Sequence, residues 1–102
     1  MKLYYVYILK CNDGLLYTGF TNDIDRRFTE HQEGRDKTSF TYKRRPLELI
    51  FHQAFNDVHQ AIYFEKKIQK WSSEKKWALA NGTFDTLKLL AECRNQTHAK
   101  NK

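Results

Sequence analysis

The sequence has few cysteines and no long apolar segment. Only Cys11 and Cys93 occur among 102 residues, and neither belongs to a CxxC pair or to a His/Cys group with zinc-ligand spacing. We therefore expect reduced thiols, as in cytoplasmic proteins, rather than a zinc site or a disulfide. No apolar run approaches the roughly 20 residues that span a bilayer, and no small-residue cleavage site follows the N-terminal aromatic run. These absences argue against a membrane-spanning or exported chain and predict a cytoplasmic location.

Positive charge is in excess of negative charge. There are 18 Lys and Arg against 12 Asp and Glu, which gives a net charge of +6. Apolar residues make up 40% of the chain, enough for one modest core. We expect a single domain over residues 1–93 and a polar tail over 94–102. The basic balance favours a polyanionic partner, most commonly nucleic acid, although the same charge also serves solubility.

Hydrophobic periodicity and turn signals predict the element order β-β-α-β-α-α-α. A strand over residues 3–10 is apolar on both faces, so it should lie in the centre of its sheet. Gly14 would supply the positive φ of a turn into a second strand. Asn22 would cap a first helix that ends before Gly34. The fold class is therefore α+β, a three-stranded antiparallel sheet flanked by helices. The remaining elements are expected over residues 15–20, 22–32, 47–55, 58–71, 73–80 and 83–93, with a polar loop over 34–46.

The helix expected over residues 58–71 carries a carboxylate among apolar residues. Glu65 falls within a stripe at helical spacing that consists of Val58, Ala61, Ile62 and Ile68. A carboxylate that faces a core is costly unless it is paired or bound to a metal. Glu65 is thus a candidate metal ligand. An ion pair with Arg27 or a lysine, or a helix rotated to bring Glu65 to its edge, would also explain its place.

The predicted hairpin and first helix place further polar groups together. Tyr7 and Tyr17 lie on paired strands within cross-strand reach, although strands favour aromatic residues in any case. Gly19 stands inside a strand and ahead of a helix. It indicates a close backbone approach that would admit a phosphate, or it simply ends the strand. Arg27 and His31 are four residues apart and share a helical face.

These residues, in this order, resemble the GIY-YIG nuclease family. The two signature triplets of that family correspond to Tyr5-Val6-Tyr7 and Tyr17-Thr18-Gly19, with Tyr5 in place of the first glycine. The similarity runs from residue 4 to about residue 90. The segment that follows Glu65 and the basic loop that ends at Pro46 look like the small stand-alone bacterial branch, the UPF0213-type and URI domain proteins.

The resemblance implies a metal-dependent DNA endonuclease or nickase of low sequence specificity, with repair or recombination as its setting. Glu65 would hold one Mg²⁺ or Mn²⁺ ion, and Arg27 would contact the scissile phosphate. Tyr7, oriented by Tyr17, would help to deprotonate the attacking water, and His31 could share that work. The alternative is a non-catalytic nucleic-acid-binding or partner-docking module that retains the fold.

Basic residues would provide the binding surface. They flank the loop over residues 34–46 and follow Glu65, and they comprise Arg35, Lys37, Lys43, Arg44, Arg45, Lys66, Lys67 and Lys70. Contacts to phosphates carry no sequence information, so we expect non-specific or structure-selective binding of DNA by a monomer or weak homodimer. The aromatic residues Phe40, Tyr42 and Trp71 could stack on bases of an opened strand, or they could belong to the core.

Overall fold

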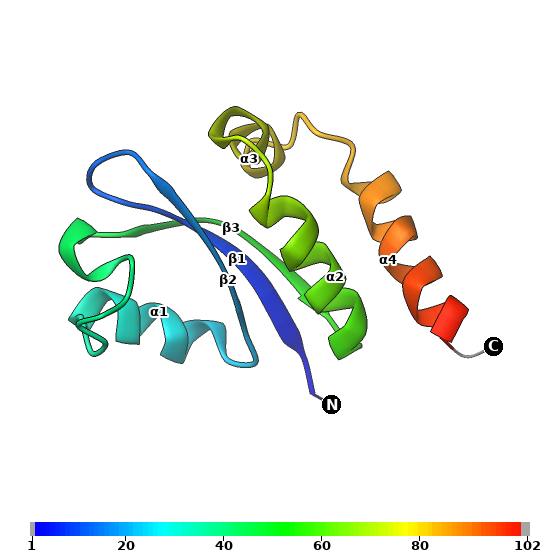
Figure 1. Ribbon diagram of the computed structural model, residues 1–102, viewed down its shortest axis with the longest axis horizontal. Coiled ribbons are helices and arrows are strands. Elements are labelled where there is room, and N and C mark those ends of the chain that lie inside the picture. The colour runs from blue at the N-terminus through cyan, green and yellow to red at the C-terminus, as the bar shows by residue number, and fades with distance from the viewer. Residues whose placement is uncertain (1, 101–102) are drawn as a thin grey trace.

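A three-stranded antiparallel sheet lies between helices in the computed structural model, which describes residues 2–100 and the side chains of residues 2–94 (Figure 1). The predicted order of elements and the α+β class are confirmed. In chain order the elements are β1 (Tyr4–Lys10), β2 (Leu16–Thr21), α1 (Ile24–Glu33), the 3₁₀ turn η1 (Tyr42–Arg44), β3 (Glu48–Phe55), α2 (Val58–Gln69), α3 (Ser73–Ala80) and α4 (Thr86–Lys100). None of the helices in this part of the chain has the length and apolar character needed to cross a bilayer.

Strand β1 is the central strand, as its apolar sequence predicts. The strand order is β2-β1-β3, and both neighbours run antiparallel to β1. The four residues from Val6 to Leu9 are at most 1% exposed, because β1 is covered on both faces. Gly14 has a φ of 88° in the turn between β1 and β2, so the expected role of glycine there is confirmed.

The two ends of α1 are set by local hydrogen bonds. Asp23, not Asn22, is the N-cap, because its carboxylate accepts a hydrogen bond from the Arg26 backbone N–H. The side chain of Asn22 instead accepts one from the Arg26 guanidinium at 3.3 Å. Gly34 ends the helix in the left-handed conformation, with a φ of 66°, as predicted.

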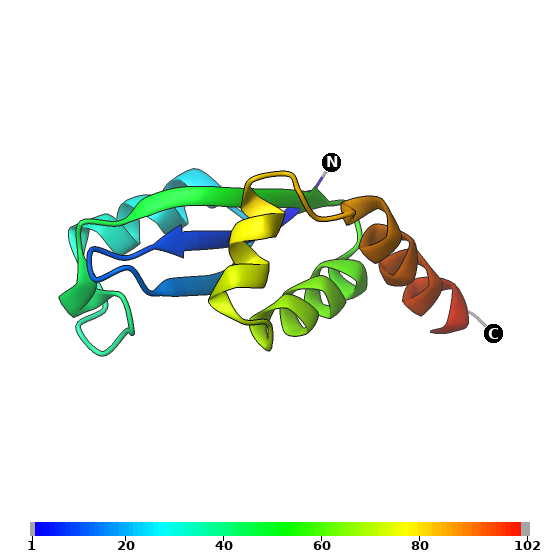
Figure 2. The same cartoon turned by 90° about the horizontal axis from the view of Figure 1, so that it is seen from above.

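The sheet separates two clusters of buried side chains. Tyr7, Leu9, Cys11 and Leu47 pack beneath α1 on one face. Alternate residues of β1, Val6 and Ile8, point to the other face, where α2 covers them. Figure 2 shows α1 and α2 on opposite sides of the sheet. Cys11 and Cys93 belong to different clusters and are both free, so the expectation of two unbridged thiols is confirmed.

The C-terminal helices differ from the predicted boundaries. Helix α2 ends at Gln69 rather than Trp71, and Ser72 caps α3 through the Lys75 backbone N–H. Helix α4 begins at Thr86 rather than Thr83 and continues to Lys100, beyond the predicted end at Cys93. Phe84 precedes α4 because its ring packs on Trp71, with 4.7 Å between centroids. Trp71 therefore contributes to packing rather than to an open surface for bases.

Candidate active site

Tyr7 lies across its neighbouring strand. Its partner in the register of β1 and β2 is Gly19. A Cβ atom at Gly19 would be 2.9 Å from Cε1 of Tyr7 and closer still to its Cζ and hydroxyl oxygen. The ring therefore extends from the central strand over the backbone of the edge strand. The close approach expected at Gly19 is present, but the Tyr7 ring, not a phosphate, fills the space. Gly19 also lies well before the N-terminus of α1.

The Tyr7 hydroxyl is joined to a chain of buried hydrogen bonds. It lies 3.0 Å from Nε2 of His31, and Nδ1 of His31 lies 2.8 Å from Oγ1 of Thr41. Thr41 is fully buried and also contacts Ser39, with 3.1 Å between hydroxyl oxygens. If Nδ1 carries the imidazole proton and donates to Thr41, the lone pair on Nε2 accepts the Tyr7 hydroxyl proton. The arrangement connects a phenol, an imidazole and two alcohols.

Burial favours the neutral forms of both members of this pair. Desolvation raises the pKa of Tyr7 to about 12, although a hydrogen bond and the charge of Arg27 act in the opposite direction. Burial, and then the charge of Arg27, lowers the pKa of His31. His31 is therefore neutral near pH 7 and can accept a proton, while Tyr7 retains its own. A negative charge that forms on the Tyr7 oxygen would be stabilised by Arg27.

Arg27 presents its guanidinium between Tyr7 and a carboxylate. Its Nη1 lies 3.1 Å from Oε1 of Glu30, one turn along α1. About a third of its side chain is exposed, so a bound phosphate can reach it. Glu30 and His31 also line a small cavity with Arg27, of about 150 Å³. The ion pair holds the guanidinium in place at the edge of the tyrosine–histidine cluster.

Tyr17 completes this cluster on the edge strand. Its ring centroid is 6.4 Å from that of Tyr7 and 5.3 Å from that of His31. On its other side it stacks with Phe40, at 6.0 Å. Tyr17 is half-buried, whereas Tyr7 is 1% exposed. Of the two tyrosines, Tyr17 is therefore the one that a ligand on the surface would meet first.

Glu65 has no hydrogen bond or ion pair with the other four predicted residues. The buried stripe of α2 consists of Ala61, Phe64 and Ile68, and Ile62 is 36% exposed, so the predicted stripe is wrong at Ile62. This rotation brings Glu65 to the edge of the stripe, where it is partly buried. It forms no ion pair or hydrogen bond within the described part of the chain, which rules out the predicted pair with Arg27. Burial raises its pKa, and the charge of Lys66 opposes that shift.

The surroundings of Glu65 fit a cation held by one protein ligand. The residues that the structure describes contain no group of three or more His, Cys, Asp and Glu side chains suited to a metal ion. A partly buried carboxylate without a counter-ion is nevertheless an oxygen ligand of the kind that Mg²⁺ accepts, with the remaining positions filled by water and substrate oxygens. Glu65 can therefore hold an ion only together with a ligand that brings oxygens of its own.

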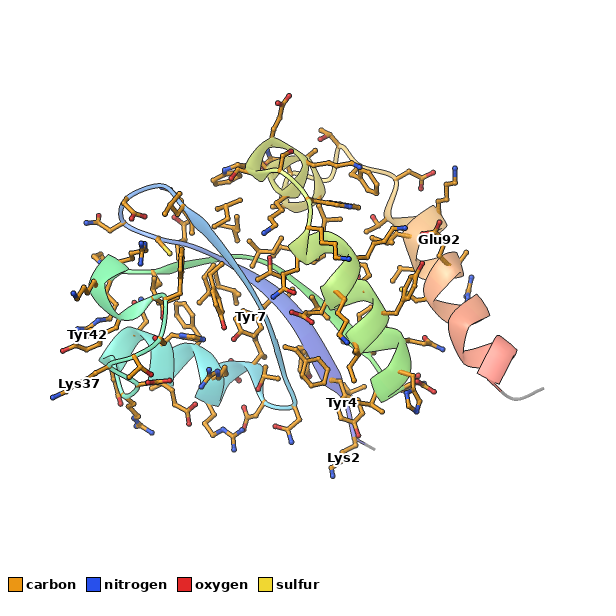
Figure 3. The ribbon with its side chains drawn as sticks, in the orientation of Figure 1. Lys2, Tyr4, Tyr7, Lys37, Tyr42 and Glu92 are labelled. Carbon is orange, nitrogen blue, oxygen red and sulfur yellow. The ribbon has the colours of Figure 1, made fainter. Side chains whose placement is uncertain are left out.

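The predicted basic residues divide into two groups. Arg44 donates to the Phe40 carbonyl oxygen at 2.7 Å and Arg45 to that of Tyr42 at 2.9 Å, so both guanidinium groups brace the loop. Arg35 pairs with Glu33, and Lys67 lies 4.0 Å from Glu92. The exposed lysines include Lys37, which extends outward from the loop in Figure 3, and also Lys43, Lys66 and Lys70.

Two residues of the cluster were not predicted from the sequence. Thr41 orients His31, and Glu30 holds Arg27. Glu30 could have been found, because it is three residues after Arg27 on a predicted helix. Thr41 lies in a polar loop without periodicity, and only the folded chain brings it to His31.

Comparisons with known proteins agree with this geometry. The GIY-YIG catalytic domain matches residues 3–78. A UPF0213 protein of Bacillus pumilus is 40% identical over 73 residues, which cover 72% of this chain and 74% of that protein. The UPF0213 protein SSP2268 of Staphylococcus saprophyticus is 38% identical over 79 residues, which cover 78% of this chain and 95% of that protein.

Two solution structures are also similar. One is the UPF0213 protein BH0048 from Bacillus halodurans, with 38% identity, a TM-score of 0.51 and coverage of 78% of this chain and 83% of that one. The other is the protein EF2693 from E. faecalis, with 32% identity, a TM-score of 0.57 and coverage of 83% and 91%. The matched span includes the tyrosine cluster, Arg27, His31 and Glu65, and this chain therefore belongs to the GIY-YIG catalytic domain family, with UPF0213 proteins as its relatives.

Proposed function

We propose that the protein is a metal-dependent endonuclease or nickase that hydrolyses phosphodiester bonds of DNA with little sequence specificity. The observation that carries the proposal is the buried contact between Tyr7 and His31, beside the partly exposed guanidinium of Arg27. A purely structural cluster would have no need of a phenol, a neutral imidazole and a cation that converge at a sheet edge.

The chain's own residues supply the proton path. A water oxygen would attack phosphorus, its proton would pass to the Tyr7 oxygen, and the Tyr7 proton would pass to Nε2 of His31 as the bond from phosphorus to the leaving oxygen breaks. The leaving oxygen would take a proton from solvent, to which His31 then returns the one it accepted. His31 can take this proton because it is neutral and its other nitrogen is fixed by Thr41. Tyr17, which is more accessible, orients the phosphate. Arg27 neutralises charge on the phosphate oxygens.

Glu65 would hold the divalent ion, Mg²⁺ or Mn²⁺, and the ion would supply stabilisation of the charge on the phosphate and the leaving oxygen. Its unpaired, partly buried carboxylate supports this role. The exposed lysines Lys37, Lys43, Lys66 and Lys70 would hold the nucleic acid by charge alone, which is consistent with low specificity.

Plasmid nicking with Mg²⁺ or Mn²⁺ tests the proposal. Wild type should convert supercoiled to open-circular DNA, whereas Glu65→Ala should not. Equal nicking by both would mean that Glu65 takes no part or that a contaminating nuclease is responsible. The substrates should include duplex, branched and single-stranded DNA as well as RNA.

No hydrogen bond or ion pair joins Glu65 to the tyrosine cluster in the described part of the chain, which favours one second candidate, a binding module without catalysis. Failure of the wild type to cleave any of these substrates, together with measurable binding, would select it.

A further inference from the structure

An open groove of about 210 Å³ adjoins the tyrosine cluster on the outer side of Tyr17. Its walls come from β2, the loop before η1, α2 and α3, and they consist of Leu16, Tyr17, Thr18, Phe40, Gln69 and Lys76. Tyr17 belongs both to this groove and to the cluster, since its ring also contacts His31. A ligand in the groove would therefore lie beside the proposed reaction centre.

Lys76 is a buried cation without a counter-ion. Only 8% of the residue is exposed, although Lys75 beside it is exposed. No carboxylate lies within ion-pair distance of Lys76 in the part of the chain that is described. Burial lowers the pKa of Lys76, since the ammonium is partly desolvated. Lysine is almost never buried unless it is paired, so Lys76 requires an explanation.

Thr18 faces the same groove with an unsatisfied hydroxyl. It pairs with Ile8 in the register of the sheet, so its side chain lies on the α2 face. Thr18 is 5% exposed, and its Oγ1 is buried without a hydrogen-bond partner. Buried polar atoms of this kind are uncommon, because each forfeits its hydrogen bonds to water. A donor that lacks an acceptor thus lies in the same groove as a cation that lacks an anion.

We propose that Thr18 and Lys76 form a phosphate subsite that receives a nucleic-acid phosphate adjacent to the one at Arg27. Phosphate oxygens would accept a hydrogen bond from each, and the Gln69 amide offers a further donor from α2. The Lys76 ammonium can only donate and carries positive charge, which favours an anion over a cation, and the Thr18 hydroxyl can donate to the same anion.

The groove suits a phosphodiester strand better than a small free anion. It is open to the surface, so a chain can enter and leave, and the stacked rings of Tyr17 and Phe40 form one wall on which a base or sugar can pack. The subsite rests on the proposed function, since it places a strand next to the tyrosine cluster. It would fix the register of the strand relative to Arg27, a task that exposed lysines cannot perform.

Metal-free binding tests the subsite separately from cleavage. A fluorescein-labelled single-stranded oligodeoxynucleotide is titrated in EDTA at several salt concentrations with wild type, Lys76→Met and Thr18→Val. We expect each substitution to weaken binding about tenfold, as for the loss of one charge-assisted hydrogen bond. Lys76→Met should also reduce the slope of log affinity against log salt by about 0.7, the value for one phosphate contact on a single strand.

Two controls separate the outcomes. Lys88→Met removes an equal charge from α4, away from the groove, and should change affinity less than about twofold. Thermal unfolding should show that Thr18→Val and Lys76→Met are at least as stable as wild type, because the first removes an unsatisfied buried hydroxyl and the second a charge on a largely buried residue without a counter-ion. Wild-type binding that both variants retain in full would overturn the subsite and leave the nuclease proposal intact. No binding by wild type would overturn both.

Discussion

Replacing Gly19 with alanine should damage the site through Tyr7 alone. The added Cβ would meet the Tyr7 ring at distances that real contacts do not allow. Gly19 has an ordinary backbone conformation, since the positive-φ glycines are Gly14, Gly34 and Gly82, so backbone strain plays no part. Without the ring, Gly19→Ala would instead stabilise the strand by about 0.5–1 kcal/mol, through the lower entropy of the unfolded chain. The sign of the effect therefore depends on the residue at position 7.

The size of the loss follows from the contacts of Tyr7. Overpacking costs about 1–3 kcal/mol. A ring that moves aside also breaks the hydrogen bond to His31 and leaves two buried groups unsatisfied, at about 1–3 kcal/mol. Allowing for partial relaxation, we expect Gly19→Ala to lower the free energy of unfolding by about 2–4 kcal/mol. Urea denaturation followed by tryptophan fluorescence measures this change.

A double-mutant cycle with Tyr7→Leu decides the cause. Leucine lacks Cε1, Cζ and the hydroxyl, so Gly19→Ala in that background should be neutral or stabilising by up to about 1 kcal/mol. Gly14→Ala is the control, because its φ of 88° makes alanine costly and no side chain lies near it. Its cost, about 1 kcal/mol, should be equal in both backgrounds. If Gly19→Ala destabilises the Tyr7→Leu protein as much as wild type, the ring is not the reason for glycine at this position.

Three further predictions concern the cluster. Thr41→Val should lower the nicking rate by about 10-fold to 100-fold without changing metal-free DNA affinity, since it frees the His31 tautomer; a parallel loss of affinity would contradict this. The pKa of His31 is lower in the folded chain than in the unfolded chain. The neutral imidazole therefore contributes its full stabilisation above about pH 6.5, and this contribution is lost as the pH falls, because the unfolded chain binds the proton more readily. Wild type should thus lose more stability than His31→Gln in urea titrations between about pH 7.5 and pH 5; parallel curves would refute the shift. Arg27→Ala should reduce nicking by about 10²-fold or more and binding less than about fivefold, and a collapse of binding with normal residual turnover would make Arg27 a docking residue only.

Local signals in the sequence were sufficient for the fold. The double-sided apolar character of β1 predicted its central place, and Gly14 and Gly34 predicted a turn and a helix end because each acts through its own backbone. The choice between Asn22 and Asp23 as the cap could not be made this way, since both residues suit an N-cap. The ends of α2 and α4 were missed because tertiary packing between Trp71 and Phe84 decides where the chain turns.

The candidate site was predicted only in part, because the sequence reveals local spacing but not tertiary packing. The pairing of Tyr7 with the β2 segment and the helical spacing of Arg27 and His31 are local, and the cluster they form is present. The orientation of α2 is not local: Phe64 and Ile68 turn inward against Val6 and Ile8, and this rotation exposes Ile62 and moves Glu65 to the edge. Hydrophobic periodicity alone could not distinguish this orientation of α2 from the one in which Ile62 is buried.

The position of β2 at the edge of the sheet bears on aggregation. An edge strand offers unpaired backbone groups that another chain could extend into a larger sheet, and proteins often protect such edges with charged side chains. Here Arg27 interacts electrostatically with Tyr17, and Lys76 lines the same groove as Tyr17. An incoming strand would have to bury the partly exposed Arg27 and would leave the already buried Lys76 without a counter-ion, whereas a phosphodiester chain would neutralise both. The same two charges that would receive nucleic acid thus disfavour the pairing of another strand with the β2 edge.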